Sequence, residues 1–121
     1  MTDAIVQFFA AWSETDADRR AEAIRNAVED GVMYADPRTE APITDVSALA
    51  DYVAGFASNS PGWAADVVRT DETAGTHRVT VNFHGPGPDG AEMSMLGQYF
   101  AELESDRIRR LIGFAGTGNP E

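Results

Sequence analysis

Residues 29–37, Glu-Asp-Gly-Val-Met-Tyr-Ala-Asp-Pro, contain the first extended segment of the chain and separate two stretches of helical periodicity. Within them, residues 32–36 form a short apolar run that predicts a β-strand. Gly31 is a typical C-terminal stop for the preceding helix. Pro37 ends the run because proline has no N–H to donate to a neighbouring strand.

The segment before this strand has the spacing of two amphipathic helices. The first can be capped by Thr2 or Asp3, and its apolar stripe follows i, i+3, i+4, i+7 spacing: Ile5, Phe8, Phe9 and Trp12. The second begins at Asp16 or Asp18 and has an apolar face made of Ala23, Ile24, Ala27 and Val28.

A third helix and four strands are predicted after Pro37. Asp45 or Ser47 can cap the helix, whose apolar side consists of Leu49, Tyr52, Val53 and Phe56. Beyond Gly62 the hydrophobic period changes to two, which predicts strands over residues 63–70, 77–84, 93–103 and 107–114. Short links rich in glycine and aspartate join these strands, so neighbours should be antiparallel. Three helices followed by a curved antiparallel sheet indicate an α+β fold with the helices on one face.

Composition limits the classes of function. The 121 residues fit one domain, and 20 acidic against 9 basic residues give a formal charge of −11. A field of that sign repels phosphates, so nucleic acids and anionic membranes are poor partners. All basic residues are arginines and cysteine is absent, which excludes lysine Schiff bases, thiol nucleophiles, disulfides and cysteine-bound metals. The N-terminal stretch has neither a positively charged leader nor the length to span a bilayer, so we expect a soluble, cytoplasmic protein.

The order of the motifs resembles one family. Residues 29–37, then Pro42-Ile43-Thr44 and a helix, are similar to the SnoaL-like branch of the nuclear transport factor 2 superfamily, which includes ketosteroid isomerase, polyketide cyclases and limonene-epoxide hydrolase. Residues 97–103 and 106–108 resemble the last two strands of that family. The resemblance implies a single domain over residues 1–121, with an ordered core of about residues 3–115 and a loose tail.

The fold implied by this resemblance is a cone, the cystatin-like α+β roll. A strongly bent antiparallel sheet wraps around the N-terminal helices and leaves an apolar cavity at the wide end. Members of the family commonly form homodimers through the outer face of the sheet, so the resemblance also implies a homodimer. The irregular alternation of polar and apolar side chains on the predicted strands fits a sheet that lines a semi-polar pocket or forms a dimer contact. It also fits arginines at strand ends whose charged groups reach water.

The resemblance to ketosteroid isomerase implies three catalytic positions in this chain. Its general base is the aspartate of an Asp-Pro pair at the end of the first strand, which Asp36 and Pro37 match. Trp12 stands where that enzyme has an oxyanion-binding tyrosine, and Tyr99 corresponds to its second donor, an aspartate. Two of the three positions are therefore replaced, but indole N–H and phenol O–H are both donors. We predict that Asp36 transfers a proton while Trp12 and Tyr99 polarise a carbonyl oxygen.

Each candidate also has a structural interpretation. Asp36 could serve the turn that begins at Pro37, which is a common use of Asp-Pro. Trp12 ends an apolar helical stripe, and Tyr99 could be a core residue with a solvated hydroxyl. Further side chains are predicted to line a ligand cavity: Tyr34, Phe9, Val32, Phe56, Trp63, His84 and Phe114.

Three functions are compatible with these residues, and none requires a cofactor. His77 and His84 fall on opposite faces of one strand, so they cannot share a metal ion, and no phosphate-binding glycine loop is present. The first hypothesis is a cofactor-free isomerase or cyclase acting on a hydrophobic carbonyl compound. The second is a non-catalytic module that binds a small hydrophobic molecule or a partner chain. The third is water activation as in an epoxide hydrolase, which needs an Asp-Arg-Asp relay.

Overall fold

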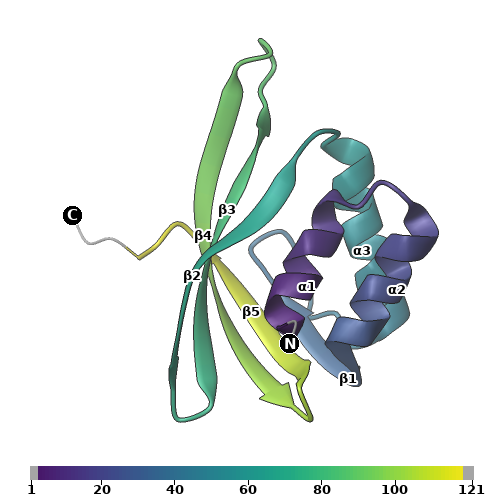
Figure 1. The fold of residues 1–121 in the computed structure, drawn as a ribbon, viewed down its shortest axis with the longest axis vertical. Coiled ribbons are helices and arrows are strands. Elements are labelled where there is room, and N and C mark those ends of the chain that lie inside the picture. Colours follow the sequence, from purple (N-terminus) through teal and green to yellow (C-terminus); the bar gives the residue numbers. More distant parts are fainter. Residues whose placement is uncertain (1–2, 119–121) are drawn as a thin grey trace.

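Helices packed on one face of a curved sheet make up a two-layer structure (Figure 1). The computed structural model describes residues 3–118. The predicted Thr2 cap and residues 119–121 of the predicted tail lie outside this range. The elements are α1 (Ala4–Ala10), a 3-10 turn η1 (Ala11–Ser13), α2 (Ala17–Ala27), β1 (Val28–Ala35), α3 (Val46–Asn59), β2 (Ala64–Thr73), β3 (Thr76–Pro86), β4 (Glu92–Glu104) and β5 (Arg107–Ala115).

Aspartate side chains fix where the three helices begin. Asp3 accepts a hydrogen bond from the backbone N–H of Ile5 at 2.8 Å, and Asp45 accepts one from Ala48 at 2.8 Å. Asp16 caps α2 through the N–H groups of residues 18 and 19. These bonds satisfy N–H groups that have no partner within a helix, which is why aspartate is favoured at this position.

The predicted end of the second helix is wrong. α2 stops at Ala27, and Val28 already has the extended conformation of β1 with φ −122° and ψ 155°. Gly31 therefore lies inside β1 rather than at a helix terminus. The β-branched Val28 is 1% exposed and packs in the core from an extended backbone, a conformation that suits its restricted χ1.

The α+β class with a curved sheet is confirmed, and the sheet is mixed. Its strand order is β1-β5-β4-β3-β2, and β2 to β5 form the predicted antiparallel meander. The first strand pairs in parallel with the last, with Tyr34 opposite Leu111. Figure 1 shows the long β3–β4 hairpin extending beyond the helical layer. Within residues 3–118, no helix is long and apolar enough to cross a membrane.

An aromatic cluster between helices and sheet forms much of the core. Phe8 and Phe9 of α1 are fully buried, and the ring of Phe9 contacts that of Tyr99 edge-on with centroids 4.9 Å apart. The Tyr99 ring lies over Gly113 of β5, where the Cβ of any larger residue would come within 2.5 Å of it. Gly113 therefore provides the space that this ring occupies.

We expect Gly113→Ala to destabilise the protein by about 1–3 kcal/mol, because the added methyl group displaces the Tyr99 ring from a packed core. Gly31→Ala is the matched control, since no atom lies within 4 Å of the position its Cβ would take. That control should change the free energy of unfolding by less than about 0.5 kcal/mol. Urea unfolding of both variants measures the difference, and equal stabilities would contradict the packing of Tyr99 on Gly113.

Candidate functional site

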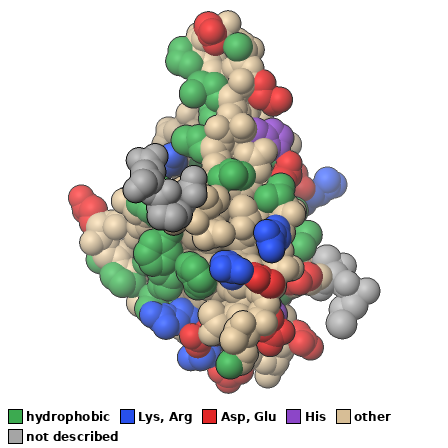
Figure 2. Space-filling view, turned by 90° about the vertical axis from the view of Figure 1, so that its left-hand side faces the viewer, with side chains coloured by type: hydrophobic (Ala, Val, Ile, Leu, Met, Phe, Trp, Pro, Cys, Tyr) green, Lys and Arg blue, Asp and Glu red, His purple; other side chains and the backbone are tan. Residues whose placement is uncertain are grey.

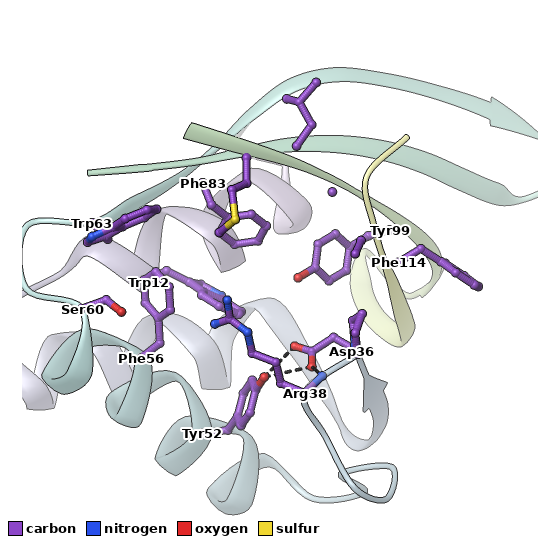
Figure 3. A pocket seen from close by; sticks show the side chains of 15 residues that line it. Trp12, Asp36, Arg38, Tyr52, Phe56, Ser60, Trp63, Phe83, Tyr99 and Phe114 are labelled. Carbon is purple, nitrogen blue, oxygen red and sulfur yellow. Dashed lines mark hydrogen bonds between the residues drawn. The ribbon is translucent and has the colours of Figure 1, made fainter. Parts of the chain in front are cut away.

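A cavity of about 280 Å³ lies between the helices and the sheet, lined by η1, the turn after β1, α3 and strands β3 to β5 (Figure 3). Six residues singled out from the sequence line it: Trp12, Asp36, Phe56, Trp63, Tyr99 and Phe114. The ring of Phe114 points away from the cavity (Figure 3). The six residues come from separate parts of the chain, so the fold alone brings them together. Most of the lining is aromatic or aliphatic, which suits an apolar ligand.

Four other predicted side chains lie elsewhere. Phe9 and Val32 are fully buried in the core, and Tyr34 is fully buried behind Asp36. His84 lies on the face of β3 opposite to Phe83, and its Nε2 is 2.6 Å from Oδ2 of Asp66. That hydrogen bond raises the pKa of His84. None of these four residues lines the cavity.

The carboxylate of Asp36 accepts hydrogen bonds from three parts of the structure. Its Oδ2 accepts the hydroxyls of Tyr34 at 2.6 Å and Tyr52 at 2.7 Å. Its Oδ1 accepts the backbone N–H groups of Arg38 at 2.8 Å and Thr39 at 3.2 Å. The half-buried Asp36 side chain therefore has the predicted role in the turn and also lies on the cavity. It stabilises the turn and joins it to β1 and α3.

All three tyrosines of the protein surround this carboxylate or face the same cavity, and all three resist ionisation. Burial raises the pKa of Tyr34 well above its ordinary value, and the nearby Tyr99 and Asp36 add to the effect. Burial and the hydrogen bond to Asp36 raise the pKa of Tyr52. Burial raises the pKa of Tyr99 to about 12. At neutral pH the three phenols are therefore hydrogen-bond donors.

Two further side chains that line the cavity, Tyr99 and Trp12, carry hydrogen-bond donors. Figure 3 shows the hydroxyl of Tyr99 turned into the cavity. Trp12 is 3% exposed, and its Nε1 is the one buried side-chain polar atom without a hydrogen-bond partner among the described residues. A buried N–H without a partner carries a desolvation cost of about 1–3 kcal/mol. A ligand oxygen that accepts from Trp12 would remove this cost.

Several lining residues are not predicted from the sequence, and of these Tyr52 and Arg38 matter most for chemistry. Tyr52 falls on the predicted apolar side of its helix, and a hydroxyl in such a row is itself a sign of a polar contact inside the protein. Arg38 lines the cavity from the turn and is the only basic side chain among the described residues that do so. No group of three His, Asp or Glu side chains placed to hold a metal ion occurs within residues 3–118.

Comparison with known proteins agrees with this geometry. The family model described as a SnoaL-like domain matches residues 5–111. A comparison with curated proteins gives no match.

Solved structures with the same fold cover nearly the whole chain. A candidate isomerase of the SnoaL-like family from Agrobacterium tumefaciens is 22% identical, with a TM-score of 0.79 over 94% of this chain and 95% of that one. A protein from Catenulispora acidiphila with a ketosteroid isomerase-like fold, in complex with trimethylamine, is 9% identical, with a TM-score of 0.77 over 96% and 87%. TerC, co-crystallised with polyporic acid, is 12% identical, with a TM-score of 0.71 over 94% and 92%.

We expect none of the three tyrosines to ionise near pH 10 in the folded protein. Because their pKa values are raised on folding, the unfolded chain loses phenolic protons first as the pH rises. These phenols should therefore leave the free energy of unfolding unchanged below about pH 10, the ordinary pKa of tyrosine. Above that pH they should lower it. Ultraviolet absorbance of phenolate, followed together with circular dichroism, measures both events. A phenol that titrates near pH 10 while the fold is intact would contradict the described burial.

Proposed function

The chain belongs to the SnoaL-like domain family, and we propose that it is a cofactor-free enzyme of the isomerase or cyclase class that moves a proton on a small hydrophobic carbonyl compound. One observation carries the proposal. A carboxylate, an indole whose buried N–H has no partner among the described residues, and a tyrosine that stays neutral line the same largely apolar cavity. These are the groups needed to remove a proton next to a carbonyl and to stabilise the resulting oxyanion.

In the proposed reaction, one group of side chains binds the substrate oxygen and Asp36 moves the proton. Trp12 Nε1–H and the Tyr99 hydroxyl donate to the carbonyl oxygen of the substrate. Asp36 takes a proton from the adjacent carbon, the C–H electron pair moves into the new C–C double bond, and the oxygen acquires the negative charge. Where a second double bond is conjugated with the enolate, return of the proton from Asp36 to the far carbon completes an isomerisation. Attack of the enolate carbon on a second carbonyl forms a ring and an alkoxide, which takes the proton back from Asp36, and this gives a cyclisation.

Tyr52 controls access to the proton acceptor. Both positions of Oδ2 are occupied by hydroxyls, so one must leave before a proton can arrive. Tyr34 is fully buried, whereas Tyr52 is half-buried and lines the cavity. The Tyr52 hydroxyl is therefore the one that rotates away, and it does so towards the space in which the substrate lies.

Two fold relatives support a small organic ligand, since one was solved with trimethylamine and another with polyporic acid. The cavity volume of about 280 Å³ falls near the lower end of the range for ligand pockets. We therefore expect a small substrate, and an extended polycyclic compound would protrude beyond the cavity mouth.

A non-catalytic binding module is the second candidate, and the hydrogen bonding of Asp36 favours it. A carboxylate has about four acceptor positions, and four donors already fill those of Asp36. In that case the carboxylate serves only to hold the cavity in shape. The third candidate, an epoxide hydrolase, needs a second aspartate at the cavity, and Asp36 is the only carboxylate among the described residues that line it.

Asp36→Asn separates the first two candidates. We expect the wild-type protein to exchange the α-hydrogens of small hydrophobic ketones for deuterium, as followed by proton NMR in heavy water. In the variant the rate of this exchange should be about 10²–10⁴-fold lower, because the amide cannot accept the proton. Near-ultraviolet circular dichroism should be unchanged if the fold is intact.

Asp51→Asn is the matched control, since Asp51 is exposed on the same helix as Tyr52 and lies outside the cavity. It should exchange at the wild-type rate. If the wild-type protein binds the ketones without catalysing exchange, the binding module is the correct function and the proton-transfer proposal is wrong.

We also propose a homodimer formed through the outer face of the sheet. Figure 2 views the molecule from the sheet side and shows hydrophobic side chains gathered on part of that surface. The exposed apolar side chains of β4 and β5 include Leu96, Phe100 and Phe114, and the rings of the last two are 5.7 Å apart. An exposed aromatic pair on a sheet is typical of an interface between copies.

Light scattering should give about twice the chain mass of 13.0 kDa at micromolar concentration. Phe100→Asp should shift the mass towards the monomer, because it places a charge in the apolar patch. Val6→Asp is the control, since Val6 is 45% exposed but lies on α1 in the helical layer. A wild-type mass near 13.0 kDa would overturn the dimer.

A further inference from the structure

A second hollow, of about 480 Å³, lies among the helices next to the first cavity. It is lined by η1 and the residues that follow it, by α2, by the C-terminal half of α3 and by the turn that leads into β2. It shares three lining residues with the first cavity: Trp12, Ser60 and Trp63. The two spaces are therefore neighbours, with the indole of Trp12 as part of the wall of each.

Arg20 lines this second hollow and has an unusual environment. It is 8% exposed and is the one charged side chain among the described residues that is buried to this extent. Its Nε donates to the carbonyl oxygen of Glu14 at 3.0 Å. Its two terminal amino groups have no hydrogen bond to any described residue, and no carboxylate of residues 3–118 lies within 4.0 Å of its nitrogens.

Three exposed arginines have carboxylate partners among the described residues, whereas Arg20 and five others have none. Arg78 pairs with Asp71 at 2.6 Å, and Arg109 pairs with Glu102, although all four of these side chains have solvent access. Arg20 differs from the other arginines without a partner in that those are exposed. Burying most of a charged side chain without a counter-charge is costly. The terminal amino groups of Arg20 are not among the wholly buried polar atoms, so they remain accessible to an anionic group from outside the protein.

The rest of the lining combines apolar and hydroxyl side chains. Ala54, Ala57 and Pro61 provide apolar surface, and Thr15 and Ser58 provide hydroxyls. Glu14 also lines the hollow, and its carboxylate accepts the backbone N–H of Asp16 at 3.1 Å. A monoanion would match the single positive charge of Arg20, whereas a dianion such as phosphate would add excess negative charge beside Glu14.

We propose that this hollow is a binding site for a small carboxylate with an apolar body, and that the terminal amino groups of Arg20 hold its carboxylate. The planar guanidinium matches a carboxylate through two parallel hydrogen bonds. The apolar body lies against the aliphatic side chains of α3 and the two indoles. The site is distinct from the Asp36 cavity and does not depend on the chemistry proposed there.

Tryptophan fluorescence provides a direct measure of binding. The protein has two tryptophans, and both line this hollow. The probes are 3-phenylpropanoate and its neutral analogue 3-phenylpropanamide, which have nearly the same shape. We expect the carboxylate to change the fluorescence and to bind at least about tenfold more tightly than the amide, since charge-assisted hydrogen bonds are roughly twice as strong as neutral ones.

Two arginine variants locate the binding. Arg20→Lys keeps the charge but removes the paired donors, and it should weaken carboxylate binding by about tenfold or more. Arg19→Lys is the matched control on the exposed side of the same helix and should bind as the wild type does. Circular dichroism checks that both variants fold.

The proposal is overturned if the wild-type protein binds the carboxylate no better than the amide, or binds neither. It is also overturned if Arg20→Lys and Arg19→Lys weaken binding equally. If Arg20→Lys does not fold, the comparison of the two probes on the wild-type protein decides. Asp36→Asn should leave carboxylate binding unchanged, so failure at this site is distinguishable from failure of the proposed reaction.

Discussion

The hydrogen bonds to the Asp36 carboxylate join three parts of the chain at one side of the cavity. Tyr34 belongs to β1, Tyr52 to α3, and the two N–H donors to the turn between them. The same segment is held a second time, because Tyr34 and Ile43 exchange backbone hydrogen bonds at 2.8 and 2.7 Å. Loss of the carboxylate would leave the buried Tyr34 hydroxyl without an acceptor. The cavity and its carboxylate are therefore parts of one hydrogen-bonded unit.

Trp12 has a comparable role on the helical side. Its ring contacts Phe56 and Phe83, with centroids 4.9 and 5.8 Å apart, and so connects α3 to β3. One side chain forms a wall of both hollows, and its N–H is the buried donor without a partner among the residues described. A ligand that moves this indole in one hollow must change the shape of the other, because close-packed aromatic rings transmit displacement.

Local patterns in the sequence are sufficient to predict most of the fold. Helix caps at Asp3, Asp16 and Asp45 are recognisable because a short acidic side chain before an apolar stripe has a direct physical reason. The end of α2 cannot be recognised from the sequence, since Val28 fits the apolar side of a helix as well as it fits a strand. The parallel pairing of β1 with β5 is also missed, because partners some eighty residues apart leave no local pattern.

The candidate site can be predicted from the sequence less completely than the fold. Asp36, Trp12 and Tyr99 follow from the family resemblance, whereas their surroundings depend on tertiary contacts. The helical spacing does indicate that two polar residues lie on buried helix faces. Tyr52 lies between apolar neighbours on α3, and Arg20 precedes Ile24 by four residues and so shares its buried face. A polar side chain in an apolar row is therefore as informative as a recognised motif.

The four donors around Asp36 weaken it as a base, and the size of that effect decides whether proton transfer is feasible. Giving up one hydrogen bond to a carboxylate costs about 1.5–3 kcal/mol, equivalent to roughly 10–100-fold in rate. Correctly placed acid–base catalysis supplies about 10²–10⁴-fold. The Tyr52 hydroxyl that leaves Oδ2 also faces the cavity, where it can donate to the substrate oxygen as negative charge develops. The hydrogen bond is then transferred rather than lost, and its energy is recovered in the transition state.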